Sequence, residues 1–216
     1  MKVVKIVLGG LVAALLFFVA FLVFVAPSDF SVARSIEISA PKAYVFPAVN
    51  KLKNWKHWMI WAERDPNMEI TYSGPDTGIG SKSAWQSESQ GSGEMECLAT
   101  ELDKSVTYRL YFPDFDMASE VIMKVEEVSP EVTRVTWLNE GDVGGNPINK
   151  LFAMNMDSMV GPDFEAGLSN MKKWVESKPE ALEADAAPAK IESETPAVME
   201  PPSNETDQKE GQPVDK

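Results

Sequence analysis

The segment Asn54 to Pro66, NWKHWMIWAERDP, contains three tryptophans and the only histidine of the chain, His57. An imidazole acting as a general base would need an orienting carboxylate and a position inside a pocket. A metal site would need at least two further ligands at suitable spacing, and the sequence offers none. We therefore interpret His57 as a partly solvated surface residue near Glu63 and Arg64. The spacing identifies no catalytic residue, no metal ligand set and no cofactor site.

The tryptophans of this segment admit two interpretations. On a helix, Trp55, Trp58 and Trp61 lie three residues apart and therefore line one side. Either the rings lock short helices against a sheet, or Trp55 and Trp58 form part of a cavity wall. The lone cysteine, Cys97, excludes an intrachain disulfide and a cysteine-based metal cluster. We interpret Cys97 as a small buried hydrophobe.

The N-terminal region contains a long apolar run over residues 6–26, IVLGGLVAALLFFVAFLVFVA. As a helix rising about 1.5 Å per residue, this run spans about 31 Å, the thickness of a hydrocarbon core. The alternative is a cleaved signal peptide, but its apolar region is usually about 7–15 residues long. The end of the run also lacks the small-x-small cleavage pattern before Pro27. We favour an uncleaved transmembrane anchor over residues 1–27.

The charges beside this run predict its orientation. Lys2 and Lys5 precede it, and the first charged residue after it is Asp29. The positive-inside bias keeps the N-terminus in the cytoplasm. We therefore expect a single-pass membrane protein whose remaining chain is exported, into the periplasm if the source is a Gram-negative bacterium.

The chain is acidic, with 20 basic against 33 acidic residues. This balance argues against nucleic acid as a partner and disfavours peripheral binding to anionic lipid. Residues 177–216 carry ten acidic residues against four lysines, six prolines and no aromatic residue. Such a segment cannot bury enough apolar surface to offset its ordering entropy. We predict a disordered acidic tail, rich in Pro, Glu and Ala, over 177–216.

The remaining residues, 31–176, have the length and patterning of one folded domain. A strand over 31–38 precedes a helix beginning at Pro41, which we expect Pro47 to break or kink, and a second short helix over 50–60. Alternation then predicts six strands, over 68–72, 81–86, 94–100, 106–112, 117–128 and 132–139. An apolar stripe from Pro147 to residue 175 predicts a long final helix, kinked at Gly161-Pro162. An antiparallel sheet with helices on one face is an α+β fold.

An ordered set of short motifs runs through the same region. It comprises Arg34-Ser35-Ile36-Glu37-Ile38 with Ala40-Pro41 and Val45-Phe46, Asn54-Trp55, Trp58, Trp61-Ala62, Asp65-Pro66-Asn67-Met68, Tyr72-Ser73-Gly74-Pro75, Val135-Thr136-Trp137 and Asp163-Phe164-Glu165-x-Gly167-Leu168-x-Asn170-Met171-Lys172. This set resembles the SRPBCC, or START-like (Bet v 1-like), superfamily, and is most similar to its polyketide cyclase/dehydrase-like branch in small membrane-anchored bacterial proteins. The resemblance implies a helix-grip fold, in which a curved seven-stranded antiparallel sheet encloses space against the long C-terminal helix. The superfamily includes lipid carriers, hormone receptors and cyclases, so the fold does not give the chemistry.

The phase of the strands and of the last helix predicts which side chains point inward. The expected ligand-cavity residues are Trp55, Trp58, Trp85, Met95, Tyr108, Leu110, Met117, Trp137, Phe152, Met156 and Met159. Methionine and aromatic side chains adapt to ligands of varied shape. The alternative is that the same residues fill an ordinary core.

Three functions remain open. The first is a membrane-anchored module that binds a lipid or another hydrophobic small molecule. The second is an enzyme of the cyclase or dehydratase type, which needs paired titratable groups in the pocket. The third is a non-enzymatic interaction module with a filled core and an unknown protein partner. We interpret the remaining polar candidates as solvated charges at strand rims: Glu94, Arg109, Asp116, Glu120, Asp157 and Asp163.

Overall fold

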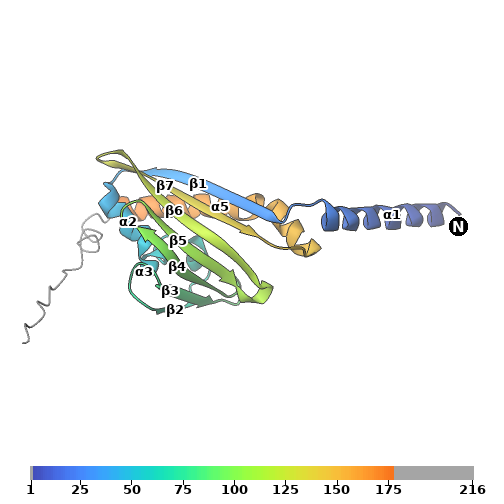
Figure 1. Ribbon diagram of the computed structural model, residues 1–216, viewed down its shortest axis with the longest axis horizontal. Coiled ribbons are helices and arrows are strands. Elements are labelled where there is room, and N and C mark those ends of the chain that lie inside the picture. The colour runs from blue at the N-terminus through green and yellow to red at the C-terminus, as the bar shows by residue number, and fades with distance from the viewer. Residues whose placement is uncertain (1, 178–216) are drawn as a thin grey trace, which may run out of the picture.

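The computed structural model of the chain describes residues 2–177 (Figure 1). Apart from Ser177, the predicted acidic tail over 177–216 lies outside the described residues. An apolar helix projects from one end of a domain in which a curved sheet wraps around helices (Figure 1).

The sheet is seven-stranded and antiparallel, in the order β1-β7-β6-β5-β4-β3-β2. Its strands are β1 (Asp29–Ile38), β2 (Glu69–Ser73), β3 (Lys82–Gln86), β4 (Gly93–Glu101), β5 (Ser105–Phe112), β6 (Met117–Ser129) and β7 (Val132–Asp142). Alternate residues of a strand point to opposite faces, so Val121, Met123 and Val125 of β6 are buried. The predicted helix-grip fold is confirmed, with each strand within a few residues of its expected position.

Four of the helices occupy the concave side of this sheet, whereas the first projects away from it and a short 3-10 turn joins β5 to β6. The helical elements of the described residues are α1 (Lys2–Phe24), α2 (Lys42–Asn50), α3 (Leu52–Trp55), α4 (Ile60–Arg64), the 3-10 turn η1 (Pro113–Phe115) and α5 (Pro147–Ser177). The long helix α5 contacts β1 and runs along one edge of the concavity. The helix α2 contacts β6, β7 and α5, and Figure 1 shows α2 and α3 at the left end of the sheet.

Two details of the predicted helices differ from the structure. The segment 50–60 does not form one helix, because Met59 has an extended backbone that separates α3 from α4. The helix α2 continues through Pro47 to Asn50 without a break. The carbonyl of Pro47 accepts hydrogen bonds from the Lys51 amide and from Asn54 Nδ2, at 3.3 and 3.0 Å, which tie this turn to the next helix.

Arg34 holds β1 against α5. This residue lies in the inward phase of β1, where the apolar alternation is interrupted, and its guanidinium pairs with Asp157 at 2.8 Å and Glu165 at 2.7 Å. Gly161 leaves room for that guanidinium, since a Cβ at this position would lie 2.2 Å from Arg34 Nη2. Gly167 is buried, and its absent side chain lets α5 approach Trp137.

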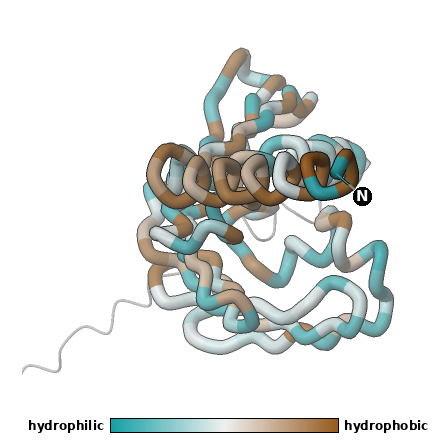
Figure 2. Tube along the Cα trace, turned by 90° about the vertical axis from the view of Figure 1, so that its right-hand side faces the viewer, coloured by the Kyte–Doolittle hydropathy of each residue, from teal (hydrophilic) through white to brown (hydrophobic). Residues whose placement is uncertain are grey.

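The helix α1 is almost fully exposed, and Figure 2 shows that it is apolar along most of its length. Among the described residues it is the one helix long and apolar enough to cross a membrane, a test that a signal sequence near the N-terminus also passes. Its last turn contacts α5: Leu22 is buried, and Lys150 Nζ donates a hydrogen bond to the Val23 carbonyl at 3.1 Å.

Candidate functional site

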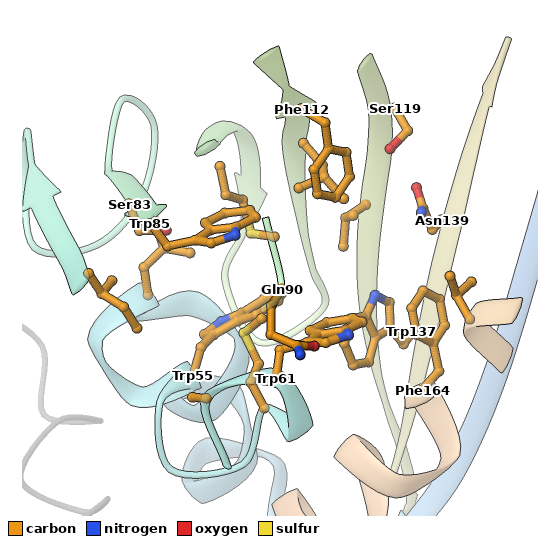
Figure 3. A pocket seen from close by; sticks show the side chains of 18 of the residues that line it. Trp55, Trp61, Ser83, Trp85, Gln90, Phe112, Ser119, Trp137, Asn139 and Phe164 are labelled. Carbon is orange, nitrogen blue, oxygen red and sulfur yellow. The ribbon is translucent and has the colours of Figure 1, made fainter. Parts of the chain in front are cut away.

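A cavity of about 280 Å³ lies between the concave face of the sheet and helices α3, α4 and α5 (Figure 3). Its wall consists of Phe30, Leu52, Trp55, Lys56, Met59, Trp61, Ala62, Met68, Ile70, Tyr72, Ser83, Trp85, Gln90, Met95, Leu110, Phe112, Met117, Ala118, Ser119, Val121, Trp137, Asn139, Met156, Val160 and Phe164. Most of these side chains are apolar. The volume is about twice that of the roughly 150 Å³ apolar cavities that hold a benzene molecule.

The strands contribute their alternate residues to this wall. Leu110 and Phe112 of β5, Met117 and Val121 of β6, and Trp137 of β7 all point to the concave face. Because period-two alternation fixes which face a residue occupies, the strand pairing alone brings these side chains together.

The wall residue Trp55 and the core residue Trp58 both donate their indole N–H groups to backbone carbonyls. Trp55 Nε1 donates to the Val49 carbonyl and Trp58 Nε1 to the Ala48 carbonyl, both at 3.1 Å. The ring centroids of Trp55 and Trp58 lie 4.7 Å apart. These bonds anchor both rings to α2 and fix the position of Trp55 on the cavity wall.

The helix α4 closes one side of the cavity and is tied to α5 through two carboxylates, those of Asp163 and Glu63. Asp163 accepts hydrogen bonds from Trp61 Nε1 at 3.2 Å and from Arg64 Nη1 at 2.9 Å. Glu63 of the same helix accepts a bond from Asn170 Nδ2 at 3.0 Å. These contacts place Trp61 and Ala62 on the wall. The residues that form the hydrogen bonds lie about a hundred positions apart in the sequence.

The structure brings seven of the eleven predicted cavity residues to the wall. They are Trp55, Trp85, Met95, Leu110, Met117, Trp137 and Met156. Whether these residues contact a ligand remains a prediction.

The other four predicted residues do not line the cavity. Trp58 and Tyr108 are fully buried in the packed core, and the Tyr108 hydroxyl donates to the Val49 carbonyl at 2.7 Å. Phe152 is in phase with Met156 but lies one turn nearer the start of α5, beyond the cavity, and is 41% exposed. Met159 precedes the wall residue Val160 by one position, about 100° around the helix, and is 52% exposed.

Sequence patterns contained a signal for some of the wall residues that we did not predict. Phe112 follows Leu110, and Asn139 follows Trp137, at the strand period of two, while Phe164 follows Met156 by eight residues on α5. The loop residue Gln90 and the α4 residues had no such signal, because their positions depend on contacts distant in sequence.

Two wall residues are titratable, Lys56 and Tyr72. Burial raises the pKa of the Tyr72 phenol, so this group is neutral and can donate a hydrogen bond at neutral pH. His57 lies outside the wall, where its ring stacks on that of Trp174 at 5.1 Å between centroids. Cys97 is buried, as expected, and burial raises the pKa of its thiol.

The remaining polar candidates also lie outside the wall. Arg109 pairs with Glu94 at 3.4 Å, and Asp116 accepts a hydrogen bond from the Tyr111 hydroxyl at 3.0 Å. Glu120 is exposed on β6. Asp157 and Asp163 serve the contacts between helix α5 and its neighbours described above. Within the described part of the chain, no group of His, Cys, Asp and Glu side chains could hold a metal ion.

Residues 29–176 match the family described as "Polyketide cyclase / dehydrase and lipid transport". The chain belongs to this family. The match covers all seven strands and nearly all of α5, and the resemblance inferred from the motifs is confirmed. No curated protein matches the sequence.

Solved structures with low sequence identity share the fold. A solution NMR structure from Thermobifida fusca has a TM-score of 0.54 at 18% identity and covers 68% of this chain and 93% of its own. Norcoclaurine synthase from Thalictrum flavum, solved in complex with dopamine and hydroxybenzaldehyde, has a TM-score of 0.55 at 12% identity, with coverages of 71% and 90%. The di-domain ARO/CYC protein BexL from the BE-7585A biosynthetic pathway has a TM-score of 0.53 at 15% identity, with coverages of 69% and 47%. At these identities the likeness concerns the fold alone.

Proposed function

We propose that the protein is a membrane-anchored module that binds a lipid or another hydrophobic small molecule in the cavity under the sheet. The observation that carries this proposal is the 280 Å³ space itself, which a predominantly apolar wall surrounds. Ligand sites are typically concave and lined by apolar and aromatic side chains with a few polar groups. The family to which the chain belongs, and a structural neighbour solved with two small aromatic molecules bound, support the same role.

The membrane part of the proposal rests on α1 and on the residues beside its end. An exposed apolar helix of 23 residues is long enough to cross a hydrocarbon core. Lys150 joins this helix to the first turns of α5, where Ile148, Leu151 and Phe152 are 65%, 41% and 41% exposed. An uncleaved anchor would bring these apolar side chains to the bilayer surface.

The domain organisation follows from the same argument. We assign residues 1–27 to the anchor and 31–176 to the binding domain, with the N-terminus cytoplasmic and the domain exported. The intact mass of the chain isolated from membranes tests the anchor. An uncleaved anchor gives the mass of the complete chain, whereas removal of the first 26 residues would contradict it.

Native mass spectrometry of the full chain released from membranes in detergent tests ligand binding. We expect the wild type to retain a bound hydrophobic molecule, and Leu110→Trp to lose it because the larger ring occupies the cavity. Leu102→Trp is the matched control, since Leu102 is 76% exposed and lies outside the wall. Absence of any retained molecule from the wild type, or equal retention by Leu110→Trp, would contradict the proposal.

A cyclase or dehydratase is the second candidate, and the observation in its favour is the presence of Lys56 and Tyr72 on the wall. Acid–base catalysis requires titratable groups within reach of the substrate. If a substrate is converted by the wild type, the variants Lys56→Met and Tyr72→Phe separate the two candidates. A catalyst loses turnover in at least one variant while binding persists.

A further inference from the structure

The cavity wall carries one charged residue among those the structure describes, Lys56. This lysine is exposed, so its ammonium group stays in contact with water at the opening of the cavity. Within the described chain, no Asp, Glu or Arg lines the same space. The wall therefore combines an apolar interior with a single cation at its opening. The other wall residues with polar side-chain groups outside the indole rings are neutral: Tyr72, Ser83, Gln90, Ser119 and Asn139.

The helix α3 and the turn after it place Lys56 at this opening. The Met59 amide donates to the Trp55 carbonyl at 2.8 Å, so the helical course of the backbone continues past Lys56. Side chains three and four residues apart share one side of a helix. Figure 3 shows Trp55 at the end of the cavity that faces the helices, away from Phe112. Four residues at this helical spacing line the cavity together: Leu52, Trp55, Lys56 and Met59.

Lys56 differs from most cations of the domain in having no acidic partner. Most Lys and Arg side chains of the domain pair with a carboxylate, as Lys53 does with Asp76 at 2.6 Å. Lys56, Lys124 and Lys173 pair with no carboxylate of the described residues. Of these three lysines, Lys56 alone lines the cavity. The unpaired cation is notable because acidic residues outnumber basic ones by 33 to 20 in the chain.

A cation at the opening of an apolar cavity suits an amphiphile with an acidic group. The hydrocarbon body of such a molecule is buried, and the burial of apolar area supplies most of its affinity. A carboxylate buried among neutral groups would be costly. At the opening, the carboxylate keeps its water and gains an ion pair with Lys56. A ligand with a positive charge gains no such pair, because no carboxylate lines the described wall.

We infer that the ligand of this cavity is an acidic amphiphile, with its carboxylate at Lys56 and its hydrocarbon body among the methionines and tryptophans of the wall. This inference rests on the proposed function, since it names the class of molecule that the same cavity binds. It separates the ligand from neutral hydrocarbons, from alcohols and from amines. In this arrangement Lys56 selects the headgroup, and the apolar wall holds the body.

The test uses three probes that share one hydrocarbon chain and differ in charge: octanoate, 1-octanol and octylammonium. Affinities for the full chain in a nonionic detergent are measured at neutral pH through the ¹³C-methyl signals of its methionines, after correction for partition into detergent. Met95, Met117 and Met156 report on the wall. Physiological ionic strength screens the net charge of the chain beyond about 8 Å. We expect octanoate to bind about two- to fivefold more tightly than octanol, the usual gain from one exposed ion pair, and octylammonium to bind most weakly.

The variant Lys56→Glu should reverse this order, so that octylammonium gains affinity, octanoate loses it and octanol is unchanged. Lys173→Glu is the matched control, because it changes the net charge of the chain by the same amount. Lys173 is also exposed and pairs with no described carboxylate, but it lies outside the wall. Both substitutions are at exposed positions, so the fold is retained, and the dispersion of the methionine signals checks this.

Each outcome decides between the proposals. Equal or weaker binding of octanoate than of octanol to the wild type overturns the inference while leaving hydrophobic binding intact. An advantage of octanoate that survives in Lys56→Glu also overturns it. So does an equal loss in Lys173→Glu, since charge would then act without regard to position. Failure of all three probes to bind contradicts the proposed function itself.

Discussion

The concave face of the sheet has two halves built from the same residue types. In the packed half, Tyr108 of β5, Leu168 of α5 and Trp58 are each at most 1% exposed. In the hollow half, Trp85 and Leu110 face the cavity and leave space beneath α4. Both halves follow the same alternation of inward and outward residues. They differ in which helix covers the sheet and in how closely that helix packs. Residue type alone therefore does not show whether a side chain fills the core or lines the cavity.

The covering helices explain the two halves. Carbonyls of α2 accept hydrogen bonds from Trp58 and Tyr108 in the packed half and from the wall residue Trp55, and these bonds hold the three rings against the helix. In the hollow half, α4 is a helix of five residues attached mainly at its rim through Asp163. Because α4 is short and is attached near its end, it covers the cavity without filling it.

The largest expected effect concerns the packed half. Trp58→Ala should lower the free energy of unfolding by about 3–5 kcal/mol, the usual cost of truncating a fully buried aromatic residue. Urea unfolding of the full chain in detergent measures this change. A loss below about 1 kcal/mol would mean that this half is not packed as described.

Replacing one leucine by tryptophan in each half compares the space available in the two halves. Leu168→Trp adds volume where no space exists and should cost at least about 1–3 kcal/mol of unfolding free energy. Leu110→Trp adds the same volume beside the cavity and should change stability by less than about 1 kcal/mol, since a void is available. Equal losses in the two variants would show that the hollow half is no more open than the packed half.

A smaller effect of opposite sign is expected at Asn139 on the cavity wall. Without ligand, Asn139→Leu should raise the free energy of unfolding by about 1 kcal/mol, because it removes an unsatisfied buried amide. Thermal unfolding of the two ligand-free proteins side by side measures the difference. A variant that is clearly less stable would indicate that the amide has a structural role instead.

The smallest effect is a pH dependence at the rim of the hollow half. Hydrogen bonds from Ser87 and from the Asn67 amide hold the pKa of Asp65, at the end of α4, below its usual value. As pH falls below about 4, Asp65 is therefore protonated in the unfolded state before it is protonated in the folded state. The stability that Asp65 contributes is fully present above that pH and is lost as pH falls through the folded-state pKa of Asp65. The stability difference between wild type and Asp65→Asn should shrink on acidification. A difference that stays constant down to acid pH would contradict this assignment.

Local patterns in the sequence were enough to predict the sheet and the final helix. Alternation placed Leu110 and Trp137 on the correct face, and the position of Pro147 marked the start of α5. The same alternation could not separate Tyr108 from Leu110, since both point inward and only the overlying helix decides which one is covered.

The cavity itself depended on contacts that no local pattern reveals. The bond from Trp61 to Asp163 joins residues 102 positions apart and turns α4 into part of the wall. Phe152 was misplaced because helical phase predicts a face but not where along the helix the neighbouring sheet ends. The extent of a cavity depends on how far neighbouring helices and strands are shifted along one another, and tertiary contacts determine that shift.

Titration of the full chain with naphthalene, followed through the ¹³C-methyl signals of its methionines, tests most directly whether the hollow half is a binding site. We predict shifts at Met95, Met117 and Met156, which line the cavity, and none at the packed residues Met123 and Met171. No shift at the three wall methionines, or shifts confined to the exposed Met154 and Met159, would contradict the account.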